Sequence, residues 1–351
     1  MRHLVRSATL IAALLIGATA AAGFQSAPEP SSLRTPSWPV GEQLQPDPAI
    51  RFGTLPNGMR FAIRRNTTPP GEASIRLWIG AGSLHEAEDQ RGLAHFLEHM
   101  VLNGTRNVPE GEFVKRLERF GLKFGPDTNA STGFTQTQYM LELPETDAAT
   151  VDTALFLLRE VADKATLDSA AIDRERGIIL SEERTRATPA FRQLQHELAY
   201  LYGGQLLPTR LPIGSTEVIR TATRQRLLDF YNAYYRPENA VLVIVGDIHP
   251  DQLETKIRQQ FGDWKGEGPA GPVPNQGQPA RRALDATAYV DRAATQRVTM
   301  TWLRPASAEP DSRAKRVREI VEALGFAVLN RRLGRIASSD NPPFVGGIGG
   351  K

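Results

Sequence analysis

The chain has 351 residues, of which 40% are hydrophobic and 23% charged. These values are typical of a soluble globular protein, and the length allows roughly two or three domains. A formal net charge of +3 is too small to indicate a nucleic-acid partner. Cysteine is absent, which excludes disulfides, thiolate metal sites and cysteine nucleophiles.

The first 22 residues predict a secretory signal peptide. Arg2 and Arg6 precede an apolar run of about 14 residues, shorter than the roughly 18–20 that span a bilayer. Ala20 and Ala22 provide the small residues of a cleavage site, and an uncleaved membrane anchor is the alternative. Residues 23–48, rich in Pro and Ser, predict an extended leader. We therefore expect an exported protein, periplasmic or secreted, with no stable membrane anchor after cleavage.

Residues 49–264 predict one α+β domain. Asn57-Gly58 lies between two alternating runs, which predicts a hairpin, and ASIRLWI predicts a third strand. Further strands are expected at TGFTQTQYMLELP and NAVLVIVGD, and helices at 92–103, 109–121, 151–164, 169–186, 224–235 and 251–264. Because strands and helices do not simply alternate, we expect a mixed, largely antiparallel sheet with helices packed on it rather than a doubly wound fold.

A second domain is expected near the end of the chain. Residues 265–280, KGEGPAGPVPNQGQPA, predict a linker. Beyond it, QRVTMTWLRP at 296–305 predicts a strand, and residues 311–337 predict a long helix. Strand, loop and long helix repeat the opening of the first domain. We therefore interpret residues 281–351 as the start of a second, similar domain that is truncated.

The segment HFLEH predicts a metal-binding helix. His95 and His99 are four residues apart, so both imidazoles can face one ion. Glu98 can reach a metal-bound water from the same helix without being a ligand, and the H-x-x-E-H pattern is that of the inverzincins. The alternative is a helix with two coincidental histidines; with six His in the chain, such a match is expected in roughly one sequence in a hundred.

A catalytic zinc needs a third protein ligand and an open position for water. The predicted helix at 170–186 offers four carboxylates: Asp173, Glu175, Glu182 and Glu183. Periodicity alone does not choose among them.

Four segments resemble, in order and spacing, successive blocks of the pitrilysin/insulinase family of zinc metallopeptidases. These segments are HFLEHMVLNGT, GLKFGPDTNASTGFTQTQYMLELP, IDRERGIILSEE and YYRPENAVLVIVGDI. The resemblance runs from about Leu55 to Trp264 and implies a unit like that of LuxS and mitochondrial processing peptidase. It further implies that Glu175 is the third ligand of a single Zn²⁺ per chain. The family's supporting acidic residue corresponds to Asp168, whose side chain is shorter than the family pattern has.

The same resemblance implies zinc-dependent hydrolysis of peptide bonds in exported peptides or unfolded polypeptides. Glu98 would act as the general base and pass the water's proton to the leaving amine. Family members bind the peptide as an added strand beside a sheet edge, and Asn129, Ala130 and Ser131 match that edge by position.

The completeness of the enzyme is open at this stage. Members of the family work as clamshells of homologous halves, so we expect a C-terminal half or a partner subunit to close the active-site chamber. The alternative is an inactive metal-binding fragment or subunit that acts through assembly with a partner chain. An iron site of two histidines and one carboxylate is disfavoured by the helical spacing of His95 and His99.

Overall fold

The computed structural model describes residues 45–351, except positions 124, 126, 281, 295, 305, 306 and 308. The predicted signal peptide, 1–22, and most of the predicted leader, 23–48, lie outside the described residues. The chain forms two compact units. Among the described residues, the larger unit comprises 48–297, and 45–47 together with 298–351 belong to the smaller one.

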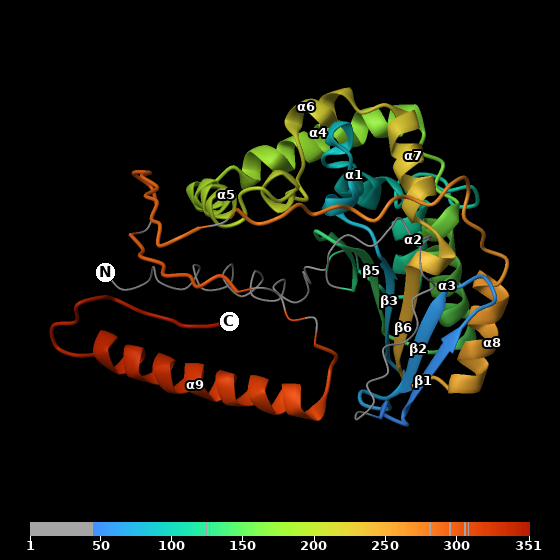
Figure 1. Ribbon diagram of the computed structural model, residues 1–351. Helices are drawn as coiled ribbons and strands as arrows, with labels where there is room; N and C mark the ends of the chain where they lie inside the picture. Colours follow the sequence, from blue (N-terminus) through green and yellow to red (C-terminus); the bar gives the residue numbers. More distant parts are fainter. Residues whose placement is uncertain are drawn as a thin grey trace, which may run out of the picture. The chain divides into compact units, whose positions relative to one another are not determined.

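The larger unit contains a six-stranded sheet with the order β1-β2-β6-β3-β5-β4 (Figure 1). The strands are β1 (Ile50–Thr54), β2 (Arg60–Arg65), β3 (Ala73–Ile79), β4 (Thr128–Thr132), β5 (Thr137–Leu143) and β6 (Ala240–Gly246). Strands β2 and β6 are parallel, and every other neighbouring pair is antiparallel. The predicted α+β fold with a mixed, largely antiparallel sheet is therefore confirmed.

The first hairpin turns at Asn57-Gly58, as the sequence predicts. Gly58 has a φ of 92°, a conformation that glycine adopts without steric cost. The side chain of Asn57 has a second contact: its Nδ2 donates to the carbonyl oxygens of Phe261 at 2.7 Å and Trp264 at 3.0 Å. The turn is thereby tied to the end of helix α8 (Pro250–Phe261).

Alternating side chains give the sheet one buried face. In β3, Ile75, Leu77 and Ile79 are fully buried, whereas Arg76 and Trp78 are only partly buried. Period-two alternation is what a strand with one face against the core requires. Helices α3 (Ala148–Asp163) and α8 contact each other and strands β5 and β2, respectively, and they lie together along one side of the sheet (Figure 1).

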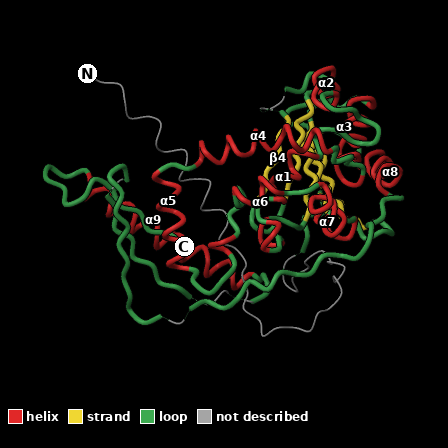
Figure 2. The backbone as a smooth tube through the Cα atoms, turned by 90° about the horizontal axis from the view of Figure 1, so that it is seen from above, coloured by secondary structure: helices red, strands yellow, loops and turns green. Residues whose placement is uncertain are grey.

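Among the described residues, the larger unit has six further α-helices. They are α1 (Leu93–Met100), α2 (Glu112–Arg119), α4 (Ser169–Arg186), α5 (Pro189–Leu201), α6 (Thr216–Thr221) and α7 (Arg224–Tyr234). Helix α1 contacts β4 and β5 as well as α4 and α7, so it lies between the sheet and these two helices (Figure 2). In the described part of the chain, none of the helices combines the length and apolar character that crossing a membrane requires.

The predicted linker belongs to a segment of the larger unit without helix or strand, residues 265–297 apart from positions 281 and 295. Two ion pairs fix the end of this segment to α5, namely Arg192 with Asp291 at 2.7 Å and Glu197 with Arg297 at 2.7 Å. The predicted catalytic domain, 49–264, lies inside this unit, and its limits remain predictions.

The smaller unit contains helix α9 (Arg313–Ala337), as predicted. The strand predicted at 296–305 is wrong, because residues 296–304 form no strand in the described structure. The segment is widely exposed, with Val298 at 91% and Trp302 at 77% of full exposure. A strand is stabilised by backbone hydrogen bonds to a neighbour, and no described strand pairs with this segment.

Candidate metal centre

Helix α1 carries the motif histidines and is anchored by its apolar side chains. Leu93, Phe96, Leu97 and Met100 are buried in the core, which fixes this short helix in place. The helix follows Gly92, whose φ is 101°; a Cβ atom there would also lie 3.0 Å from the Cα atom of the neighbouring Gly214.

The two motif histidines face each other across one turn. His95 Nε2 and His99 Nε2 are 3.2 Å apart, and the ring centroids are 4.7 Å apart. His95 is 6% exposed and Glu98 is 8% exposed, so the motif lies in a largely dehydrated environment. The structure thus brings the two imidazoles together, as their i, i+4 spacing predicts.

Helix α4 brings a carboxylate to the same place. Glu182 Oε2 lies 3.6 Å from His95 Nε2 and 3.8 Å from His99 Nε2. Zinc bonds of about 2.0–2.1 Å in a tetrahedron separate neighbouring donor atoms by about 3.4 Å. Two imidazole nitrogens and a carboxylate oxygen at these separations therefore fit a zinc ion, with a position left over for a further ligand.

Glu175, the third ligand implied by the family resemblance, lies elsewhere in the centre. Its Oε1 is 2.8 Å from Nδ1 of His99, which is the ring nitrogen that does not face His95, and its Oε2 accepts a hydrogen bond from Asn103 Nδ2 at 2.6 Å. Glu175 is not part of the three-donor cluster. The structure therefore groups Glu182, not Glu175, with the two facing nitrogens.

Glu98 is held from the neighbouring strand. Thr132, the last residue of β4, donates from Oγ1 to Glu98 Oε2 at 2.5 Å. Among the described residues, the other carboxylate oxygen of Glu98 accepts no hydrogen bond. Glu98 is therefore oriented but keeps one oxygen available for a proton.

Burial and mutual charge shift the titration of the cluster when no metal is bound. Burial, aided by the nearby His99, lowers the pKa of His95 to about 4. Burial alone would lower the pKa of His99 as well, but its hydrogen bond to Glu175 raises that pKa above the usual value. Burial raises the pKa of Glu98, and the bond from Thr132 opposes this shift. His95 is thus kept neutral, the form that binds a metal.

The remaining residues singled out from the sequence lie nearby or at a helix end. Asn129, Ala130 and Ser131 are in β4, which pairs with β5 and forms one edge of the sheet among the described strands. Asp168 is the N-cap of α4, where its carboxylate accepts the N–H of Ala171 at 3.0 Å. This position gives Asp168 a role in starting the helix.

Two contacts of the centre were not anticipated from the sequence. Asn103 lies four residues after His99, a spacing that could have indicated a shared side of the chain. Thr132 is more than thirty residues from the motif, and only the packing of α1 on β4 brings it to Glu98. No local pattern signals such a contact.

Two models of one peptidase family match the chain. Residues 61–200 match the insulinase family, peptidase family M16, and residues 221–339 match the M16 inactive domain. The chain belongs to the insulinase (M16) family. The M16 resemblance of the sequence blocks is thereby confirmed, and the first match contains the motif helix α1 together with α4.

Relatives in the M16 family are much longer than this chain. The probable zinc protease PqqL of Haemophilus influenzae is 38% identical over 215 residues, covering 61% of this chain and 23% of the relative. The crystal structure of the periplasmic protease PqqL from Escherichia coli matches with a TM-score of 0.64 and 31% identity, over 67% of this chain and 26% of that one. The chain therefore spans about a quarter of the length of these relatives.

The first half of Escherichia coli PqqL, solved separately, also has this fold. It matches with a TM-score of 0.69 and 24% identity, over 84% of this chain and 63% of that one. This M16 half contains an α+β unit followed by a second domain, which is the organisation predicted for the present chain.

Proposed function

We propose that this chain is the catalytic N-terminal part of an exported zinc endopeptidase of the M16 family. The observation that carries the proposal is the convergence of His95 Nε2, His99 Nε2 and Glu182 Oε2, with Glu98 on the same helix. His95, His99 and Glu182 would hold the ion. This assignment replaces Glu175 by Glu182 in the ligand set that the family resemblance implied.

Glu98 is proposed as the general base. A zinc ion bound by the three donors would lower the pKa of a water molecule and polarise the scissile carbonyl. Glu98 removes a proton from the attacking water and delivers it to the leaving amine. Thr132 holds one carboxylate oxygen of Glu98, so the other oxygen is directed at the proton.

Glu175 is proposed to orient His99 rather than to bind the ion. Nδ1–H of His99 donates to Glu175 Oε1, which leaves the lone pair on Nε2 and fixes the plane of the ring. Asn103 holds the second oxygen of Glu175 and so prevents the carboxylate from turning. A carboxylate behind a metal-binding histidine also raises its basicity.

The substrate is proposed to be a peptide in extended conformation. The edge strand β4 ends at Thr132, directly beside Glu98, so a strand added next to Asn129, Ala130 and Ser131 would run towards the centre. Such binding depends on backbone groups, which favours unfolded polypeptides and short peptides. The periplasmic location given for the PqqL relative supports export.

Further protein is proposed to complete the chamber, either a C-terminal half or a partner subunit. The relatives are about four times as long as this chain, of which they match 61% and 67%. Helix α9 leaves Ile320, Val321 and Leu324 about 60% exposed. Apolar side chains at this spacing form a stripe that additional protein would cover.

Zinc content and peptide cleavage test the proposal together. The chain without its predicted signal peptide, residues 23–351, and its Glu98→Gln variant should each bind one zinc ion per chain. Cleavage of a mixed quenched-peptide library should fall roughly 100- to 10,000-fold in the variant. Loss of zinc in the variant would make Glu98 a ligand and contradict its assignment as base. Zinc without cleavage in either protein would instead favour a metal-binding subunit that acts through a partner.

A further inference from the structure

Glu86 is a buried acid that the proposed mechanism does not use. It is only 4% exposed, and it lies seven residues before Leu93, the first residue of the motif helix. Its Oε2 accepts the backbone N–H of Gly92 and its Oε1 accepts that of Ala94, both at 2.9 Å. Both oxygens therefore bind the beginning of α1.

These two contacts supply what the helix itself lacks. The first N–H groups of a helix have no partner within it, and a side chain at the N-cap normally accepts one of them. The N-cap of α1 is Gly92, which has no side chain to do this. Glu86 takes over the role from outside the helix, and when its carboxyl is ionised the charge lies at the positive end of the helix dipole.

Glu86 is in turn fixed to the rest of the unit. Arg210, itself 5% exposed, donates from Nε to the backbone oxygen of Glu86 at 3.1 Å and pairs with Glu88 at 3.0 Å. Burial raises the pKa of Glu86 to about 8, against the two N–H donors and Arg210. Burying an acid at this position costs free energy. The hydrogen bonds that its side chain makes to the start of α1 offset part of that cost.

We infer that Glu86 is a positioning residue of the metal centre, which sets the first turn of α1 and thereby the direction of His95. This inference rests on the proposed zinc site. Ala94, whose N–H binds Glu86, directly precedes His95, and Glu98 and His99 follow within the next turn. Among the described residues His95 Nδ1 has no hydrogen-bond partner, so the placement of this ring depends on the backbone of α1 and on the contacts of its Nε2 atom.

The inference is tested by the zinc affinity of Glu86→Gln in the chain 23–351. The amide can accept only one of the two N–H groups and turns its own NH₂ group towards the other. The Kd for zinc, measured by competition with a chelator below the Tm of every variant, should rise about 10-fold. The shorter carboxylate of Glu86→Asp should give an intermediate rise, and it serves in place of Glu86→Gln if the amide variant does not fold.

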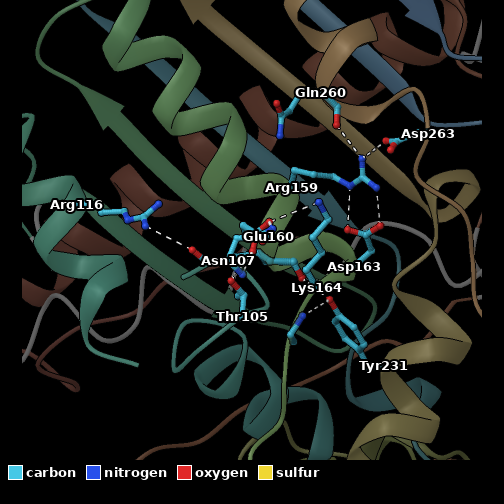
Figure 3. Close-up of polar contacts among 12 residues, drawn as sticks. Thr105, Asn107, Arg116, Arg159, Glu160, Asp163, Lys164, Tyr231, Gln260 and Asp263 are labelled. Atoms are coloured by element: carbon cyan, nitrogen blue, oxygen red, sulfur yellow. Dashed lines mark hydrogen bonds and ion pairs between the residues drawn. The ribbon is translucent and has the colours of Figure 1, made fainter. Parts of the chain in front are cut away.

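Two control variants separate positioning from general stability. Arg159 is a buried residue whose guanidinium binds Asp163, Asp263 and the backbone oxygen of Gln260, joining α3 to the end of α8 (Figure 3). Arg159→Gln should lower the Tm of the metal-free chain and leave the zinc Kd within about twofold. Glu112, at the start of α2, pairs with Lys115 at 2.9 Å, and Glu112→Gln should change neither quantity appreciably.

The outcomes distinguish this inference from the proposed function. If the unaltered chain binds no zinc, the proposed zinc site fails. If the unaltered chain binds zinc and the folded Glu86 variants bind it equally well, the role of Glu86 alone is overturned. An equal loss of affinity in Arg159→Gln would also overturn it, because the effect would then follow stability.

Discussion

Helices α1 and α4 meet at the same centre but hold their side chains in different ways. In α1, His95 and His99 are fixed relative to each other by one turn of a buried helix. In α4, the side chain of Glu175 is 10% exposed, whereas that of Glu182 is 27% exposed and also pairs with Arg186. The donor atoms on α1 are thus set by the helix itself. Those on α4 depend on how the two helices pack and on which carboxylate is free to turn.

The comparison is tested most strongly at Glu182. If this carboxylate is the third ligand, Glu182→Gln should raise the zinc Kd by more than about 100-fold, beyond what the loss of an outer hydrogen bond produces. Equilibrium competition with a chelator measures the effect. Glu183→Gln, one residue along the same helix, is the control and should bind zinc normally. An unchanged Kd in Glu182→Gln would return the third ligand to Glu175.

A smaller loss is expected at Glu175. Glu175→Gln should raise the zinc Kd by roughly 10- to 100-fold, because His99 loses a charged acceptor at Nδ1 but the ligand set remains intact. Asn103→Leu, which removes the donor that holds Glu175, should change the Kd in the same direction and by less. The roles of the two glutamates would be reversed if Glu175→Gln lost more affinity than Glu182→Gln.

The smallest effect is expected at Thr132, which contacts the base from the sheet. Thr132→Val keeps the shape and removes the hydrogen bond to Glu98, so kcat/KM should fall about 5- to 10-fold at unchanged zinc content. In the unaltered protein, the hydrogen bond from Thr132 lowers the pKa of Glu98. In the variant that pKa therefore rises, and the acid limb of the profile of kcat/KM against pH should move to higher pH. A limb that moves to lower pH would contradict the assignment of Glu98 as the base.

Local features of the fold could be predicted from the sequence. The hairpin at Asn57-Gly58 and the helix at 169–186 were placed correctly, because turn residues and apolar spacing determine them locally. The strand predicted at 296–305 is wrong, because its alternating pattern has no neighbouring strand among the residues that the structure describes. A strand requires a neighbouring strand to pair with, and the residues of one segment do not determine whether such a neighbour is present.

The same limit applies to the metal centre. The pairing of His95 and His99 follows from a spacing of four residues. Glu175 and Glu182 are seven residues apart, two turns of α4, so both lie on the side of the helix that faces α1. Helical periodicity cannot separate them, and the family pattern pointed to the residue that contacts Nδ1 of His99. Only the packing of α4 against α1 shows which oxygen lies beside the two Nε2 atoms.

The position of β6 constrains the order in which the sheet can be assembled during synthesis. Strand β6 lies between β2 and β3, although about 160 residues of chain separate it from β3. Until residue 246 has left the ribosome, β2 and β3 lack the strand that joins them in the finished sheet. An unpaired strand edge is a site at which another chain can add a strand. In a nascent or shortened chain that ends before residue 240, the edges of β2 and β3 that β6 covers would therefore be open to other chains.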